Sequence, residues 1–254
     1  HILNRQVYEA VTTRDREALL ALAGRHLGSG ARGLAVSLGT GKKMAEITPW
    51  VVESLIQGTD ARLFLSANIL DHPELLRRFG NRIVINAVTA EEDTLTFALE
   101  SARQHEAGLV VLLVRPGLTP IGLNDRLMLA ADVIEQAVRA GLHPNRLLLD
   151  PILSCRPDPN ALKMSRGLPD VGIAAETVCL IKQINPGVRT IVGLGAGQPA
   201  GSEPQGWMRQ SILTLLLEAG LDAAIMNCLE VEMIRTVQSH SAGTCSSVIG
   251  LATA

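Results

Sequence analysis

The sequence predicts an α/β fold and, within that class, a (β/α)8 TIM barrel. Short apolar segments alternate with amphipathic stretches along the chain, the pattern of parallel βαβ units. The chain has 254 residues, close to the roughly 250 residues of such a barrel. Polar residues follow several apolar segments, where a barrel carries its binding groups. An open doubly wound sheet is the competing architecture.

Seven segments are predicted to be buried strands because they are short and rich in Val, Ile, Leu and Ala. They are Ala31 to Leu38, Arg62 to Leu65, Arg82 to Asn86, Gly108 to Val114, Arg146 to Asp150, Thr190 to Gly193 and Ala223 to Asn227. A barrel needs an eighth strand, and only Ile2 and Leu3 are available before the first helical stretch. We therefore expect the first strand to be truncated at the N-terminus or to lie upstream of His1.

Amphipathic stretches between these strands predict the helices. The clearest are Ala45 to Ile56, Ala90 to Glu106, Asp125 to Ala140 and Met208 to Ala219. Gly141 and Gly220 follow two of these stretches and are expected to end the helices. We expect residues 1–254 to form one barrel domain, with Pro157 to Pro169 as a loop over one barrel face.

Composition narrows the classes of function. A formal net charge of −2 gives no electrostatic footprint for nucleic acid, and only 2% aromatic residues argue against base-stacking platforms. No apolar run is long enough to span a bilayer, and no signal segment opens the sequence. Four widely separated cysteines, with no C-x-x-C pair, favour free thiols in a reducing cytoplasm: Cys155, Cys179, Cys228 and Cys245. We expect Cys228 to be a small buried residue.

The segment Arg146 to Leu153 is the most informative part of the sequence. Its apolar run ends in Asp150, and Pro151 then stops the strand because proline cannot donate to a ladder. Asp150 should therefore emerge from the carboxyl end of a buried parallel strand, facing a pocket. The alternative is that Asp150 only begins a turn or caps a helix.

Polar groups follow other predicted strands in the same way. In chain order they are Ser37 or Gly39, Ser66, Asn86, Arg115, Asp150, the loop Gly195-Ala196-Gly197 and Asn227. Asn86 offers donors and acceptors, and beside a carboxylate it could match a flat heterocycle with an amino group, a ring N–H and a carbonyl. Asn86 could equally be an ordinary residue of a turn at a strand end.

Other motifs are weaker. The glycine-rich loop after the strand Thr190 to Gly193 could bring backbone N–H groups to a phosphate, or could be a tight turn. Gly39 to Lys43 lacks the upstream glycine and the Ser or Thr of a P-loop. No metal site is expected, because the histidines do not gather at strand ends: His26, His72, His105 and His143.

From about Val7 to Ser246 the chain resembles the pterin-binding barrel family, and within it the methyltetrahydrofolate:corrinoid/iron–sulfur protein methyltransferases more than the dihydropteroate synthases. The patches that carry the resemblance are Gly30 to Ala35, Asn81 to Asn86, Leu147 to Leu153 and Ala219 to Ile225. The resemblance implies an eight-stranded barrel, usually dimeric, that holds a reduced pterin in its carboxyl-end mouth. Asn86 and Asp150 match the family's Asn and Asp that hydrogen-bond the pterin, so residues 1–254 would form a single pterin-binding domain.

The chain departs from the family at several positions. Ser66 stands where the family has an Asp, and Ala35-Val-Ser37 replaces a D-x-N pattern. The family's Asn beside N5 of the folate appears here as Ala196, or as Gly195 if the alignment shifts by one. The Lys and the Arg-x-His with which dihydropteroate synthases bind pyrophosphate are absent. Arg209 is the basic residue nearest to the glycine-rich loop Gly195 to Gly197.

The resemblance implies a divergent methyltransferase that takes the methyl group of 5-methyltetrahydrofolate and passes it to a corrinoid. This chain has no D-x-H-x-x-G cobalamin motif, so the corrinoid would belong to a partner protein. The expected pterin-binding residues are Asn86, Asp150, Ser66 and Gln198, and the catalytic residue is not assigned. One alternative is a pterin-fold protein that binds without catalysing. Another is a barrel enzyme for a different small molecule, such as a phosphorylated one held by Gly195 to Gly197.

Overall fold

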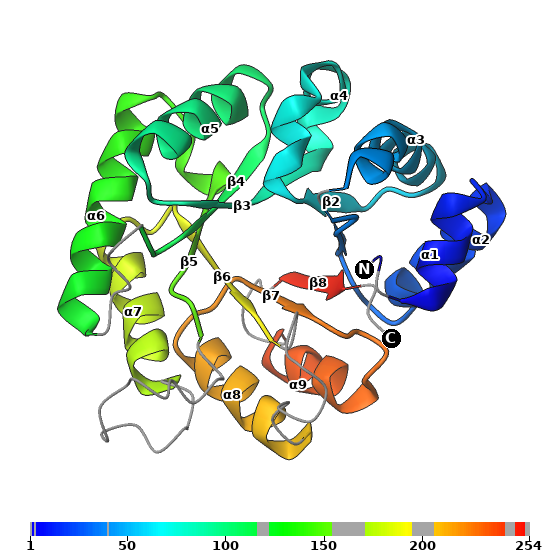
Figure 1. Cartoon of the computed structure of the whole chain (residues 1–254). Coiled ribbons are helices and arrows are strands. Elements are labelled where there is room, and N and C mark those ends of the chain that lie inside the picture. The colour runs from blue at the N-terminus through cyan, green and yellow to red at the C-terminus, as the bar shows by residue number, and fades with distance from the viewer. Residues whose placement is uncertain are drawn as a thin grey trace.

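The computed structural model describes residue 2 and residues 4–39, 41–115, 122–153, 171–194, 206–241 and 247–251. Its centre is a closed barrel of eight parallel strands, each hydrogen-bonded to the next (Figure 1). The strands are β1 (Gly33–Val36), β2 (Arg62–Leu65), β3 (Ile83–Thr89), β4 (Gly108–Leu112), β5 (Leu147–Asp150), β6 (Arg189–Gly193), β7 (Ala223–Met226) and β8 (Ser247–Leu251). The predicted α/β barrel is confirmed.

The expected position of the missing strand is wrong. Gly33–Val36 is the first strand of the barrel, and the closing strand is β8, which pairs with both β1 and β7. Ile2 lies in a turn, and its N–H donates to the carbonyl oxygen of Ser37 at 2.9 Å. Leu3 lies outside the described residues. With β8 as the closing strand and Gly33–Val36 as the first, Asn86 lies on the third strand of the barrel and Asp150 ends the fifth.

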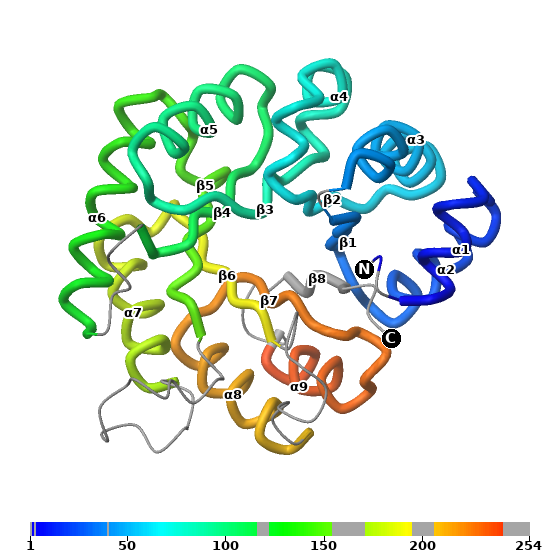
Figure 2. Tube along the Cα trace, in the orientation of Figure 1, coloured from blue at the N-terminus to red at the C-terminus, as the bar shows by residue number. Residues whose placement is uncertain are grey.

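Helices surround the barrel, and the chain passes around the ring one strand–helix unit at a time (Figures 1 and 2). The described helices are α1 (Arg5–Thr12), α2 (Arg16–Gly28), α3 (Lys42–Gly58), α4 (Pro73–Phe79), α5 (Glu92–Gln104), α6 (Leu123–Arg139), α7 (Val171–Ile184), α8 (Gly206–Glu218) and α9 (Val231–Ser241). Three 3-10 turns join them to the strands: η1 (Ala67–Asp71), η2 (Gly80–Arg82) and η3 (Pro144–Arg146).

Local sequence explains several helix ends. The Asn4 side chain accepts from the N–H of Val7 and begins α1, and the Asp15 side chain accepts from the N–H of Ala18 and begins α2. Gly141 follows α6 with φ +76°, and Gly220 follows α8 with φ +93°. Because only glycine adopts such angles at little cost, both predicted helix stops are confirmed.

The core has an inner and an outer part, and both are aliphatic because the chain has few aromatic residues. Inside the barrel, buried side chains from the described strands form one cluster: Ala35, Phe64, Val84, Val110, Leu148, Ile191, Ala223 and Ile225. The opposite faces of the strands pack against the helices, with Leu63, Ile85, Leu109 and Leu149 among the fully buried residues. This alternation fixes which residues can point into the barrel mouth.

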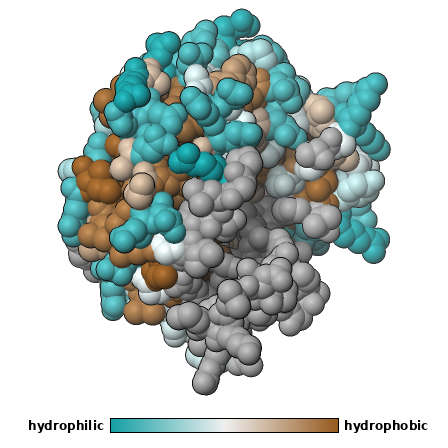
Figure 3. Space-filling model, turned by 60° about the vertical axis from the view of Figure 1, so that its left-hand side comes forward, coloured by the Kyte–Doolittle hydropathy of each residue, from teal (hydrophilic) through white to brown (hydrophobic). Residues whose placement is uncertain are grey.

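The described surface is mixed. Figure 3 shows small patches of hydrophobic side chains among hydrophilic ones on the face that is turned forward. Within the described ranges, no helix is long and apolar enough to cross a membrane. Cys179 is exposed and Cys228 is buried, each as a free thiol, so the expectation for Cys228 is confirmed. Cys155 and Cys245 lie outside the described residues.

Candidate ligand site at the carboxyl ends of the strands

A layer of residues partly open to solvent covers the core of the barrel at its carboxyl end. Side chains alternate along a strand, so the residue two positions after an interior residue faces the same side. Two positions after Phe64, Val84, Leu148, Ile191 and Ile225, the chain carries Ser66, Asn86, Asp150, Gly193 and Asn227. All five are partly buried. The sequence therefore directs these five residues to the mouth of the barrel.

Asp150 is the best-defined group of this layer. It is the last residue of β5 and pairs with Leu112 of β4, and its carbonyl oxygen accepts from the N–H of Leu113 at 2.9 Å. Its side-chain Oδ1 accepts from the backbone N–H of Ile152 at 2.8 Å. The turn interpretation of Asp150 is thus correct in part, since the carboxyl does fix the chain just after the strand.

Arg126, a residue that sequence reasoning did not single out, holds the same turn from the other side. It lies in the first turn of α6 with only 6% of its surface exposed. Its guanidinium donates to the carbonyl oxygen of Pro151 at 2.9 Å and to that of Ile152 at 3.3 Å. Ile152 has φ +58°, a left-handed angle that a β-branched residue rarely adopts. The contacts of Arg126 and Asp150 together maintain this conformation.

Burial changes the acidity of the site. Loss of hydration raises the pKa of Asp150 to about 7, although the N–H of Ile152 and the charge of Arg126 both act to lower it. Asp150 therefore exists as both the neutral acid and the carboxylate near neutral pH. A carboxyl with a strongly shifted pKa at a strand end of a barrel is typical of a binding or catalytic site.

The prediction that Asn86 ends its strand is wrong, because β3 continues to Thr89. An irregularity within the strand positions Asn86 instead. Ile85 pairs with Leu109 and Val88 pairs with Val111, so Asn86 and Ala87 together face the single residue between those partners on β4. Such a bulge interrupts the ladder and re-aims side chains, and bulges are common beside active sites. Because only β4 separates β3 from β5, Asn86 and Asp150 lie on strands roughly 10 Å apart. The two predicted residues are therefore in the same part of the mouth.

Ser66 occupies the neighbouring position on the other side of Asn86. It follows β2 and precedes η1, and it lines a cavity of about 240 Å³ between the ends of β1 and β2 and helix α3. Asn68, in η1, lies in the same lining and donates to the carbonyl oxygen of Gly39 at 3.5 Å. A serine here leaves room for a ligand group but supplies no charge.

The remaining predicted positions differ in what they contribute. Asn227 accepts through Oδ1 from the N–H of Leu229 at 3.1 Å, and Ser37 accepts through its backbone from Ile2. Arg115 pairs with Asp132 of α6 at 3.4 Å, and Arg209 pairs with Glu230 at 2.9 Å. Other predicted residues lie outside the described residues: Gly195, Ala196, Gly197 and Gln198, and the loop Pro157 to Pro169.

Two further observations concern the residues that the structure describes. No group of three or more His, Cys, Asp or Glu side chains is arranged there to hold a metal ion. A hollow of about 1370 Å³ lies between α5 and α6 on the outside of the barrel and is lined by mixed charges that include Glu100, Arg103 and Asp132. We place the site at the mouth because polar residues of neighbouring strands lie at that end and the pKa of Asp150 is shifted there.

The arrangement suits a flat, polar heterocycle. Asp150 Oδ2 accepts no hydrogen bond from the described residues, so it can accept from a ligand. The amide of Asn86 can both donate and accept. Ala87 packs against the interior cluster, and Val84 and Leu148 lie one layer below, which gives the site an apolar floor. Chemically, the site can bind and orient a ring with an edge of N–H donors.

The overall fold is similar to solved structures of dihydropteroate synthases. A Yersinia pestis dihydropteroate synthase with a pterine–sulfa conjugate has a TM-score of 0.60 at 17% sequence identity, and the match covers 90% of this chain and 89% of that chain. The Xanthomonas albilineans enzyme in complex with 7,8-dihydropteroate has a TM-score of 0.59 at 15% identity, covering 89% and 84%. The Thermus thermophilus enzyme has a TM-score of 0.58 at 13% identity, covering 90% and 88%.

No model of a known protein family matches the sequence. At these identities the structural similarity establishes the barrel fold that the chain shares with dihydropteroate synthases. The resemblance to pterin-binding barrels is thus confirmed at the level of the fold. A closer relation to the methyltetrahydrofolate:corrinoid methyltransferases stays a prediction.

Proposed function

We propose that this chain binds a reduced pterin, 5-methyltetrahydrofolate, in the carboxyl-end mouth of the barrel. The observation that carries the proposal is the placement of Asp150 and Asn86 in one layer, over an apolar floor, on strands separated only by β4. A pterin presents an amino group and a ring N–H along one edge, and a carboxylate accepts from both. Asn86 would meet the neighbouring polar atoms of the ring. The similarity to barrels solved with pterin compounds supports this ligand class.

The turn after β5 would keep Asp150 ready for the ligand. One carboxyl oxygen is fixed by the N–H of Ile152, and Arg126 fixes the carbonyl groups of the same turn. The side chain therefore loses little freedom when a ligand binds, which favours affinity. Partial burial reduces the competition of water for the carboxylate, and the raised pKa is the cost of that loss of hydration.

We further propose that the methyl group on N5 of the bound folate is transferred to a corrinoid carried by a partner protein. The sequence resemblance supports this activity. Two cations described near this end of the barrel already have partners within the chain: Arg209 pairs with Glu230, and Arg126 donates to the carbonyl oxygens of Pro151 and Ile152. A site that releases pyrophosphate would need cations for that group, whereas methyl transfer from N5 does not.

In this proposal the chain orients the folate and excludes water, while the partner supplies the methyl acceptor. The methyl group would pass to the reduced corrinoid of the partner, which supplies the electron pair of the new bond, while N5 keeps the pair of the broken C–N bond and takes a proton from solvent. Ala196 cannot hydrogen-bond N5 as that bond breaks, so Gln198, Asn68 or a water molecule would make this contact. Loss of one positioned transition-state contact commonly slows a reaction by about 10²–10³. We therefore expect a slow methyltransferase.

We also propose that the chain forms a homodimer and that it is located in the cytoplasm. The free thiols of Cys179 and Cys228 support the cytoplasmic location.

A second candidate function is binding without catalysis, and Ser66 favours it. A serine in place of the family's Asp removes a charged hydrogen bond, which weakens pterin binding by about 1–3 kcal/mol. A protein that has lost both this contact and the one at N5 could still hold a pterin or a corrinoid partner.

Single-turnover methyl transfer separates the two candidates. The purified chain is mixed with 5-methyltetrahydrofolate and a reduced corrinoid protein, and methylation of the corrinoid is followed by its visible absorbance. The first proposal expects slow methylation that requires the chain and disappears with Asp150→Asn. Folate binding with no methylation above the chain-free rate would establish the binding protein instead. If neither the folate nor the corrinoid protein binds, both candidates fail.

A further inference from the structure

The amino end of the barrel, opposite the candidate pterin site, contains a second cavity of about 500 Å³. Its floor is the bottom of the interior cluster, formed by Phe64, Val84 and Leu148. Two strands begin in it with glycine. A Cβ on Gly33 would lie 3.0 Å from the Phe64 ring, and a Cβ on Gly108 would lie 3.0 Å from a Val84 methyl. Glycine at both positions therefore leaves space that larger residues would close.

Arginines dominate the charge of this cavity. Four of them line it, against two aspartates: Arg32, Arg62, Arg146 and Arg189, with Asp60 and Asp222. Burial lowers the pKa of Arg62, and the positive charges of Arg189 and Arg146 lower it further. Arg62 and Arg189 begin β2 and β6, and Arg146 immediately precedes β5. The charges of Arg189 and Arg146 therefore repel that of Arg62 across one cavity.

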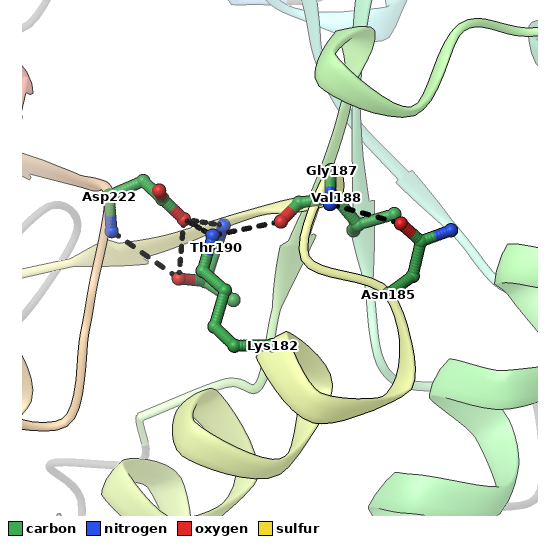
Figure 4. Close-up of polar contacts among 6 residues, drawn as sticks. All are labelled: Lys182, Asn185, Gly187, Val188, Thr190 and Asp222. Atoms are coloured by element: carbon green, nitrogen blue, oxygen red, sulfur yellow. Dashed lines mark hydrogen bonds and ion pairs between the residues drawn. The ribbon is translucent and has the colours of Figure 1, made fainter.

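One of the two aspartates is already engaged with other groups. Asp222 Oδ2 forms an ion pair with Lys182 and also accepts from the N–H of Thr190 at 2.7 Å and from its hydroxyl at 3.0 Å (Figure 4). Lys182 in turn donates to the carbonyl oxygen of Val188 at 2.9 Å. Asp222 is therefore engaged on the side of α7.

The other arginines have weak or missing counter-charges. Arg146 is 3.6 Å from Glu106, whose side chain is 73% exposed, so this pair contributes little. In the part of the chain that the structure describes, no carboxylate forms an ion pair with Arg62 or Arg189. A cavity with a small-molecule volume thus keeps at least two guanidinium groups available for a ligand.

We propose that this amino-end cavity binds a small, multiply charged oxyanion. Guanidinium groups form paired hydrogen bonds with phosphate and carboxylate oxygens, and three of them around one space match a ligand with several negative charges. The ligand would relieve the repulsion among the arginines. This site is separate from the mouth, because its arginines lie at the amino ends of the strands. Asp150 and Ser66 lie at the carboxyl ends of β5 and β2.

Calorimetric titration of the full chain tests the proposal with two probes, sodium pyrophosphate and citrate. We expect saturable binding near one per chain for at least one probe, weakened at least tenfold in Arg62→Gln/Arg189→Gln. Arg16→Gln, at an exposed arginine on α2, is the matched control and should bind like the wild type. Tighter binding of pyrophosphate would identify a phosphate ligand, and tighter binding of citrate would identify a carboxylate ligand.

Two further readouts guard against loss of the fold. Without a probe, the Arg62→Gln/Arg189→Gln variant should melt at the same temperature as the wild type or at a higher one, because two charges that repel each other are gone. The single variant Arg62→Gln changes an exposed side chain and should keep the fold. Asp150→Asn should keep the affinity for pyrophosphate or citrate, because that residue lies at the other end of the barrel. No saturable binding of either probe, or equal binding by the folded arginine variants, would overturn the proposal.

Discussion

Arg126 donates from the first turn of α6 to the carbonyl oxygen of Pro151 at 2.9 Å, one residue beyond the end of β5. This contact joins a helix to the turn that carries Asp150. The same guanidinium donates to the carbonyl oxygen of Ile152 at 3.3 Å, so without Arg126 the left-handed Ile152 would lose the partner of its carbonyl group. The acid that we assign to pterin binding is therefore held by a residue 24 positions earlier in the chain.

Replacement of Asp150 by Asn should stabilise the protein while abolishing reduced-folate binding. The raised pKa means that folding costs free energy once pH exceeds the ordinary value of 3.8, and this cost grows until pH passes about 7. Asn does not ionise, so Asp150→Asn should gain stability that is larger at pH 8 than at pH 5, by at most roughly 4 kcal/mol. Denaturant unfolding at both pH values measures the gain.

Asp71→Asn, at an exposed carboxyl, is the control and should show no such gain. A large loss of stability in Asp150→Asn at pH 8 would mean that the ionised carboxylate is a structural group, and the assignment of Asp150 to ligand binding would lose its basis.

Affinity for 5-methyltetrahydrofolate should rise with pH through neutrality. The N–H donors of a pterin bind the carboxylate form of Asp150, which predominates only above about pH 7. Between pH 6 and pH 8 the ionised fraction of a group with that pKa rises about tenfold, and the dissociation constant should fall by a similar factor. Fluorescence titration at several pH values measures this dependence. Asn86→Ala should weaken binding but keep its pH dependence, whereas an affinity that does not change with pH would exclude Asp150 as the acceptor.

Ile152 offers a test of the turn itself. Its φ of +58° costs an ordinary residue roughly 1–2 kcal/mol, and glycine is free of this cost. Ile152→Gly should therefore be more stable than Ile152→Ala by about 1 kcal/mol, although both remove the same apolar contacts. Thermal unfolding of the two variants gives the difference. The reverse order would show that the turn has an ordinary conformation in solution.

A carboxylate restored at position 66 should improve the site. Ser66 follows β2, at a position where the resemblance to pterin-binding barrels implies an Asp, so Ser66→Asp should tighten reduced-folate binding about tenfold through a charged hydrogen bond. Gln57→Glu adds the same charge at an exposed residue of α3 and should bring no gain. Calorimetry on both variants makes the comparison, and weaker binding by Ser66→Asp alone would mean that Ser66 does not face the ligand.

Most strands, and the place of Asp150 at the end of one of them, could be predicted because their signals are local. An apolar run that ends in Asp150-Pro151 carries enough information to place Asp150 at a strand end. The run up to Asn86 was expected to end there, but β3 continues to Thr89, so Asn86 lies at a bulge within the strand. The alternation of side chains then directs both residues into the barrel. The closing strand Ser247–Leu251 was missed, and its pairing with β1 and β7 identifies it.

Other features depend on the folded chain. Arg126 has the sequence pattern of an ordinary helix residue, and its role arises from contacts with Pro151 and Ile152. The pKa of Asp150 is raised by burial, which no local pattern reveals. The amino-end cavity likewise gathers Arg62, Arg146 and Arg189 from three strands, although each arginine alone resembles a solvated strand start.

Calorimetric titration with 5-methyltetrahydrofolate, with dihydropteroate as the comparison ligand, tests the central claim most directly. We predict micromolar binding of 5-methyltetrahydrofolate by the wild type at pH 8, weaker binding by Asn86→Ala and none by Asp150→Asn. Absence of binding to both ligands, or affinities that the two substitutions leave unchanged in folded protein, would contradict the assignment of the barrel mouth to a pterin.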